Sequence, residues 1–100
     1  MKINIAELRR NLIIGDNRTL GIVAVGDAAN HDCYRTFTEG RGFVGKLLWS
    51  MHGSDLVGHN VRTSGMVKKE QVIVDGVIST VIETKNSVYL LVVDEDITVL

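Results

Sequence analysis

The dipeptide Asp75-Gly76, between two runs of β-branched residues, constrains the fold of this chain more than any other feature. A two-residue type I′ turn needs positive φ at both central positions, and Asp-Gly is one of the pairs that adopt it readily. The flanking runs, 66–74 and 77–85, are therefore predicted to form an antiparallel hairpin. Asn86-Ser87 predicts a second turn, which adds a strand over 88–93.

Two-residue loops at both turns would fix the pairing register of these strands. The expected cross-strand pairs are Val74–Val77, Ile73–Ile78, Ile82–Leu91 and Val81–Val92. One face of the sheet then collects Ile73, Ile78, Ile82, Tyr89, Leu91 and Val93, and the other collects Val72, Val74, Val77, Val81, Val88, Leu90 and Val92. Both faces are apolar, whereas a sheet open to water on one side alternates more cleanly. We therefore expect both faces to be covered.

The segment 42–52 is predicted to be the main helix, and it would cover one face. Its apolar residues fall at i, i+3, i+4 and i+7 from Val44, and Gly53 follows where a C-cap glycine belongs. The second face would be covered by another copy of the chain, in a dimer that buries Val81 and Val92. The alternative is curvature of the sheet into a small barrel, which turns one face into an interior.

A short N-terminal helix is predicted over 5–13, with Asn4 as its N-cap and Glu7 at the capping-box position. Residues 2–5 also fit the start of a strand. Further strands are expected at 18–25, 34–38, 56–63 and 97–100. Together these elements predict a single α+β domain over residues 1–100, built on a mostly antiparallel sheet of about five or six strands.

The glycine-rich stretch 40–46 is the strongest candidate for a ligand site. Its sequence, GRGFVGK, matches G-x-G-x-x-G at the start of the predicted helix, where backbone N–H groups and the helix dipole attract an anion. The candidate ligand-binding residues are Gly40, Arg41, Gly42, Gly45 and Lys46, and the ligand class is a small nucleotide-like anion. The expected antiparallel strands do not provide the βαβ context of a dinucleotide fold, and Leu47 stands where a P-loop has Ser or Thr. The alternative is a loop with close packing at the helix start.

Other reactive residues show no spacing that defines a catalytic or metal site. Cys33 would need a nearby base to form a thiolate, and a free cysteine is more often a small buried residue. His31, His52 and His59 do not have the spacing of a closed zinc site. Asp94-Glu95-Asp96 is typical of a solvated turn that protects a sheet edge. We therefore predict no catalytic residue, no metal and no cofactor.

Composition argues against several classes of partner. The net charge of −1 and the isoelectric point of about 6.3 are far from the strongly basic footprint of a nucleic-acid-binding domain. No apolar run approaches the roughly 18 residues that a membrane span needs, and the first ten residues show no apolar core of a signal peptide. The single cysteine, Cys33, excludes an internal disulfide and suits a reducing compartment, so we expect a cytoplasmic protein.

Two short patterns give the C-terminal part a family resemblance. Val61–Ser64 has the form V-x-T-S, and Thr84–Tyr89 has the form T-x-N-S-x-Y, with an apolar strand between them. Residues 56–100 thereby resemble the tail of short uncharacterised open reading frames of phages, plasmids and bacteria. The resemblance implies a β-rich chain of mobile-element origin and no named activity.

These observations favour a non-catalytic binding or interaction protein that acts as a homodimer through its sheet. The alternative is a small enzyme or sequestering protein that acts on an anionic, nucleotide-like ligand at Gly40–Lys46. An enzyme needs an acid, a base or a nucleophile in mutual reach, and the sequence shows no such set at recognisable spacing.

Overall fold

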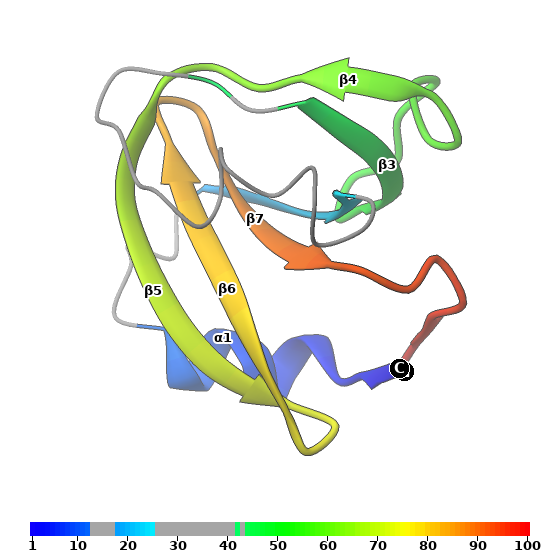
Figure 1. Ribbon diagram of the computed structural model, residues 1–100, viewed down its shortest axis with the longest axis vertical. Coiled ribbons are helices and arrows are strands. Elements are labelled where there is room, and N and C mark those ends of the chain that lie inside the picture. The colour runs from blue at the N-terminus through cyan, green and yellow to red at the C-terminus, as the bar shows by residue number, and fades with distance from the viewer. Residues whose placement is uncertain (13–17, 26–41, 43) are drawn as a thin grey trace.

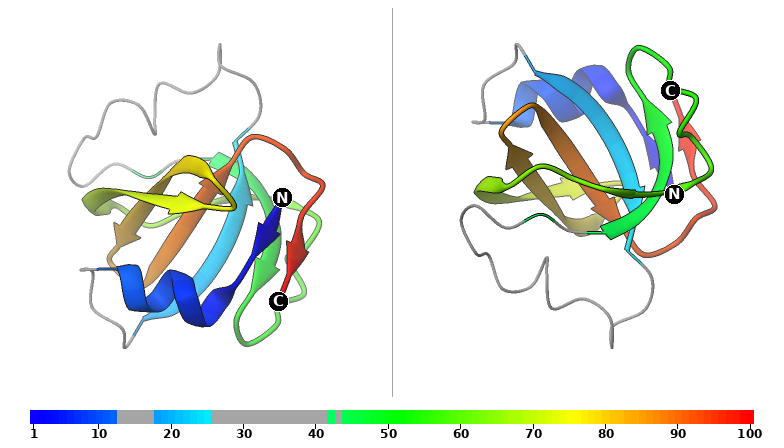
Figure 2. Two further views of the ribbon diagram at one scale, coloured as in Figure 1. Left: turned by 90° about the horizontal axis from the view of Figure 1, so that it is seen from below. Right: turned by 90° about the horizontal axis from the view of Figure 1, so that it is seen from above.

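The computed structural model describes residues 1–12, 18–25, 42 and 44–100 (Figure 1). Its main element is a six-stranded sheet in the order β4-β3-β2-β7-β6-β5. The strands are β2 (Thr19–Ala24), β3 (Val44–Ser50), β4 (Asn60–Arg62), β5 (Met66–Val74), β6 (Val77–Thr84) and β7 (Ser87–Val92). The helix α1 (Ile5–Asn11) lies across one face, and β1 (Lys2–Ile3) pairs in parallel with β8 (Thr98–Val99) (Figure 2). The predicted α+β class is therefore confirmed.

The sheet is mostly antiparallel, as predicted, but it is mixed, because its two central strands run parallel. β2 pairs with β7 from Thr19–Ser87 to Ala24–Val92. The other four strand contacts in this sheet are antiparallel. Parallel neighbours require a long crossover, and here the crossover passes through β3, β4, β5 and β6. Turn residues indicate pairing only between strands that follow each other in the chain. The pairing of β2 with β7 was therefore not predicted.

The predicted main helix over 42–52 is wrong. Residues 44–50 form β3, which pairs with β2 on one side and with β4 on the other. Gly45 was a signal against the helix, because a glycine in a helix interior costs about 1 kcal/mol relative to alanine.

A β-bulge explains the misleading helical spacing. Val23 pairs with Leu47 and Ile22 pairs with Trp49, so Leu48 is an extra residue in β3. An extra residue resets the alternation of side chains between the two faces. Leu47 packs in the core on one face, whereas Leu48 and Trp49 pack against the core on the other. Consecutive apolar residues on both faces thus imitate the stripe of an amphipathic helix.

The Asp75-Gly76 hairpin is confirmed. Both turn residues have positive φ, +51° and +74°, as a type I′ turn requires. Val74 pairs with Val77, and Ile73 pairs with Ile78, as predicted.

This turn gives a direct test of the backbone argument. Nothing lies within 4 Å of the position that a Cβ of residue 76 would occupy, so a side chain there meets no steric obstacle. Gly76→Val should nevertheless destabilise the protein by about 1–2 kcal/mol, because a β-branched residue is strained at positive φ. Gly76→Asn is the matched control and should cost less, since asparagine tolerates this conformation. Urea unfolding measures both, and equal stability of the valine variant and the wild type would contradict the turn assignment.

The second turn lies one residue earlier than predicted. Its central residues are Lys85 and Asn86, and the hydroxyl of Thr84 closes it by accepting a hydrogen bond from Ser87 N (3.2 Å) and donating one to Ser87 O (3.1 Å). The predicted pairs Ile82–Leu91 and Val81–Val92 are therefore wrong. The observed pairs are Ile82–Tyr89 and Val81–Leu90. Because the partner shifts by two residues, each side chain keeps its predicted face.

The N-terminal helix is confirmed with a shorter extent, Ile5–Asn11. The side-chain oxygen of Asn4 caps it by accepting a hydrogen bond from Glu7 N at 3.0 Å. The strand alternative for residues 2–5 is also partly realised, because Lys2 and Ile3 form β1. The predicted strand at 56–63 shortens to β4, and the predicted strand at 34–38 lies outside the described residues.

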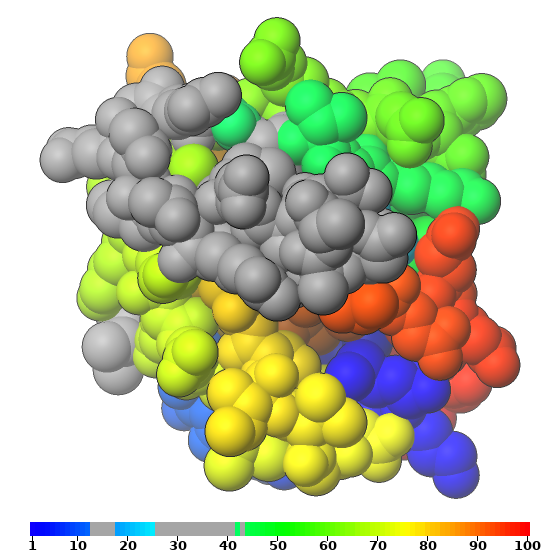
Figure 3. Space-filling view, viewed as in Figure 1, coloured from blue at the N-terminus to red at the C-terminus, as the bar shows by residue number. Residues whose placement is uncertain are grey.

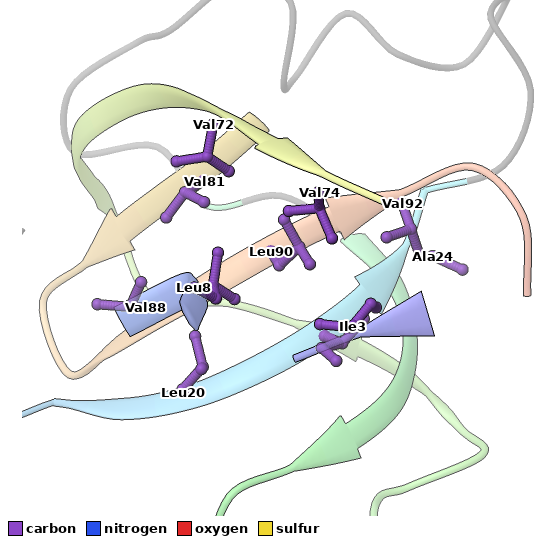
Figure 4. Close-up of a cluster of buried hydrophobic side chains, with 11 residues drawn as sticks. Ile3, Leu8, Leu20, Ala24, Val72, Val74, Val81, Val88, Leu90 and Val92 are labelled. Carbon is purple, nitrogen blue, oxygen red and sulfur yellow. The ribbon is translucent and has the colours of Figure 1, made fainter. Parts of the chain in front are cut away.

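Two hydrophobic cores occupy opposite faces of the sheet. The first lies between the sheet and α1, where side chains from β2, β5, β6 and β7 converge on Leu8 and Ile3 (Figure 4). The second contains Val23, Val25, Leu47, Met66, Ile82 and Leu91. The predicted cover on both faces is thus present over most of the sheet, with α1 on the face of Val81 and Val92 that was expected to contact a second copy.

The sheet is strongly curled, because its two edge strands follow each other in the chain. β4 and β5 lie at opposite edges, yet only residues 63–65 separate them. Such a link spans at most about 14 Å, whereas the edges of a flat six-stranded sheet would be about 24 Å apart. The sheet therefore bends until one end of β5 approaches β4, and Met66 packs in the second core (Figures 1 and 2).

Candidate functional site

The structure describes three of the five predicted ligand residues. Gly42, Gly45 and Lys46 are described, whereas Gly40 and Arg41 lie outside the described residues. Gly45 and Lys46 belong to β3, so the helix dipole that was expected to attract an anion is missing over 44–50. Ligand binding at this stretch stays a prediction.

The two described glycines have a packing role. A Cβ at Gly42 would lie 2.3 Å from the carbonyl oxygen of Thr63. A Cβ at Gly45 would lie 2.4 Å from Cγ1 of Val23 and 2.7 Å from the carbonyl oxygen of Ala24. Gly45 therefore lets β3 lie close against β2, and Gly42 lets the chain pass the link between β4 and β5.

Lys46 is engaged in an ion pair. Its Nζ lies 2.8 Å from Oε1 of Glu95, and both side chains are about half exposed. The pair lines an open groove of about 300 Å³ together with Gly45 and Asn60. An anion in this groove would have to compete with Glu95 for the ammonium group, and exposed pairs of this kind are weak in water.

The other candidate residues of the sequence do not converge. His52 and His59 are exposed, and Asp94 accepts a hydrogen bond from Asp96 N at 2.9 Å in a local turn. Within residues 1–12, 18–25, 42 and 44–100, no three His, Cys, Asp or Glu side chains gather closely enough to hold a metal ion. His31 and Cys33 lie outside the described residues.

The most conspicuous surface feature is apolar and lies around the β5–β6 turn. Four aliphatic side chains here are half exposed or more: Ile73 (69%), Val77 (50%), Ile78 (70%) and Val93 (58%). We call these four residues the hairpin patch. The hairpin that carries most of them (yellow) lies at the lower end of the molecule in Figure 3.

An apolar groove of about 400 Å³ adjoins the hairpin patch. Its apolar lining consists of Met1, Val25, Val77, Ile78, Leu91, Val92 and Val93. Asp75 and Asp94 also line it and provide a polar margin. An apolar centre with a polar rim is the usual anatomy of a protein–protein interface.

The sequence contained the signal for this surface. Three of the four patch residues, Ile73, Ile78 and Val93, belong to a face that was predicted to be apolar and in need of cover. The second core covers Ile82 and Leu91 of the same face. The second core does not reach the β5–β6 turn, because the hairpin there extends beyond the strands beside it.

Comparison with known proteins leaves the fold and the surface as the basis for function. No family model, curated protein or solved structure matches the chain. None of the helices in the described part of the chain is long and apolar enough to cross a membrane.

Proposed function

We propose that the protein is a non-catalytic interaction protein that forms a homodimer through the hairpin patch. The observation that carries this proposal is the exposure of Ile73 and Ile78, which pair with each other and are each about 70% exposed. Contiguous exposed aliphatic surface is rare on monomers and marks sites of association.

The surface is suited to a second copy of the same chain. Ile78 is exposed and also lines the apolar groove. A protruding side chain and a groove that could receive it therefore lie next to each other. A twofold axis through such a patch places each Ile78 in the groove of the other copy, because an isologous contact needs only one self-complementary surface. A standard interface buries about 800 Å² per subunit, which is roughly a seventh of the 5880 Å² surface.

The contact differs from the one that the sequence suggested. Val81 and Val92 are 0% and 3% exposed and belong to the core that α1 covers. Val81 is therefore unavailable to a partner, Val92 contributes only its small exposed part to the apolar groove, and the proposed contact moves to the exposed end of the hairpin.

Ile78→Glu should convert the dimer into an 11.0 kDa monomer, because the interface would bury a carboxylate without a partner. Sedimentation equilibrium at micromolar concentration measures the mass. The matched control is Val57→Glu, which places the same charge on another exposed valine, in the turn before β4, and should leave the dimer intact.

Two results would count against this proposal. The first is a wild-type protein that sediments as a monomer across the whole micromolar range, because no dimer would then exist. Equal dissociation of the Ile78 and Val57 variants would place the contact elsewhere or attribute it to general charge repulsion.

We further propose that the dimer acts in the cytoplasm, since a single cysteine, Cys33, suits a reducing compartment. The resemblance of residues 56–100 to phage and plasmid reading frames supports an origin in a mobile element.

Binding of a small anion at Gly40–Lys46 is the second candidate function. The groove beside Gly45 and Lys46 supports it, provided that the anion displaces Glu95.

A further inference from the structure

A small polar pocket lies on the sheet face opposite α1, away from the hairpin patch. It has a volume of about 180 Å³, and its polar lining consists of Thr19, Ser50, Ser54, Arg62, Ser87 and Tyr89. We call it the hydroxyl pocket. Neither the glycine-rich stretch nor the apolar groove shares its polar residues.

The parallel pairing of β2 with β7 assembles this pocket. In that register Thr19 lies beside Ser87, and Gly21 lies beside Tyr89. On the other side of β2, Gly21 pairs with Ser50 of β3. Residues from distant parts of the chain thus bring their hydroxyl groups to two neighbouring rows on one face of the sheet.

Gly21 leaves room for the aromatic wall of the pocket. A Cβ at this position would lie 3.0 Å from Cδ1 and Cε1 of Tyr89. The tyrosine ring therefore lies over the bare backbone of β2 and stays at the side of the pocket. The pocket is held by four adjacent strands, β4, β3, β2 and β7, which is the rigid support that a binding site needs.

The chemistry of the lining is that of an anion site. Arg62 is exposed and forms no ion pair with the described residues, and the hydroxyls of Thr19, Ser50 and Ser87 form no hydrogen bond with them. No Asp or Glu is among the described residues that line the pocket. A guanidinium group with several hydroxyl donors and no competing carboxylate is complementary to phosphate or sulfate oxygens.

We propose that the hydroxyl pocket binds a phosphate-type oxyanion, with Arg62 as its charged ligand and the hydroxyls of Thr19, Ser50 and Ser87 as neutral donors. The site is separate from the dimer contact, so a test of one proposal does not decide the other. It also differs from the predicted anion site at Gly40–Lys46, where Lys46 is already paired with Glu95.

The test is calorimetric titration with inorganic phosphate, glycerol 3-phosphate and glycerol at constant ionic strength. Both phosphates should bind to the wild type and glycerol should not, because the charged group carries recognition. Arg62→Gln should weaken phosphate binding by about tenfold or more, since it removes charge-assisted hydrogen bonds. Arg62→Lys should recover part of the affinity. Arg10→Gln, at an exposed arginine on α1, is the matched control and should bind like the wild type.

Three outcomes would overturn the proposal. One is the absence of phosphate binding to the wild type at millimolar concentration. Another is equal weakening by Arg62→Gln and Arg10→Gln, which would indicate unspecific attraction. The third is loss of binding in Arg41→Ala with full binding in Arg62→Gln, which would assign the anion to the glycine-rich stretch. Thermal unfolding of each variant shows that the fold is intact.

Discussion

Val81→Glu should prevent the chain from folding. Val81 is 0% exposed in the first core, and its two cross-strand neighbours are Leu90 and Glu70. A carboxylate here would be buried without a cationic partner and would stand opposite another acid, and both effects are unfavourable. The cost of several kcal/mol approaches the whole stability of a typical domain, about 5–15 kcal/mol. Circular dichroism and urea unfolding should therefore show no cooperative transition.

Ile78→Glu is the control for Val81→Glu, because it adds the same charge to the same strand at a 70% exposed position. This variant should unfold cooperatively, even though its association should be lost. The contrast separates the fold from the interface. A folded, monomeric Val81→Glu protein would mean that Val81 faces a partner subunit, as the sequence suggested, and would contradict the core described for α1 and the sheet.

The hairpin and the N-terminal helix were predictable because their signals are local. Asp75-Gly76 specifies a turn that needs two positive φ angles, and Asn4 supplies the side-chain cap that α1 needs. The pattern of apolar side chains also assigned the apolar residues of β6 and β7 to their faces. These features depend on residues that are neighbours in the chain, so one sequence is sufficient to find them.

The strand at 44–50 was not predictable from periodicity. The bulge at Leu48 places consecutive apolar residues on both faces of β3, and the resulting spacing is the same as that of a helix. The position of the second turn depended on the hydroxyl of Thr84, which bonds to Ser87 across the turn. Both features arise from single residues that override a general pattern.

The surfaces proposed here differ in how far the sequence could indicate them. The hairpin patch follows from counting apolar residues on a face against the elements that could cover it. The hydroxyl pocket could not be found in this way, because it depends on β2 and β7 lying in parallel. Arg62 and Ser87 belong to the patterns V-x-T-S and T-x-N-S-x-Y, but neither pattern indicates that the two residues lie close together. The topology of the sheet brings them to one pocket.

Gly45→Ala should lower the free energy of unfolding by about 3 kcal/mol, at the upper end of the usual cost of overpacking. The new Cβ would lie 2.4 Å from Val23 Cγ1 and 2.7 Å from the carbonyl oxygen of Ala24. Val23 is fully buried and Ala24 is held in pairs with both β3 and β7, so neither atom can move away cheaply. Urea unfolding measures the change.

Gly53→Ala is the control for this substitution. Gly53 has a φ of +74° and no atom within 4 Å of its Cβ position, so the alanine variant should cost only about 1 kcal/mol of backbone strain. A larger loss at Gly45 than at Gly53 would show that Gly45, the last glycine of GRGFVGK, serves packing between β2 and β3. If Gly45→Ala instead kept its stability and lost affinity for phosphate, the glycine would be required by a ligand, and the anion site would lie at Gly40–Lys46 after all.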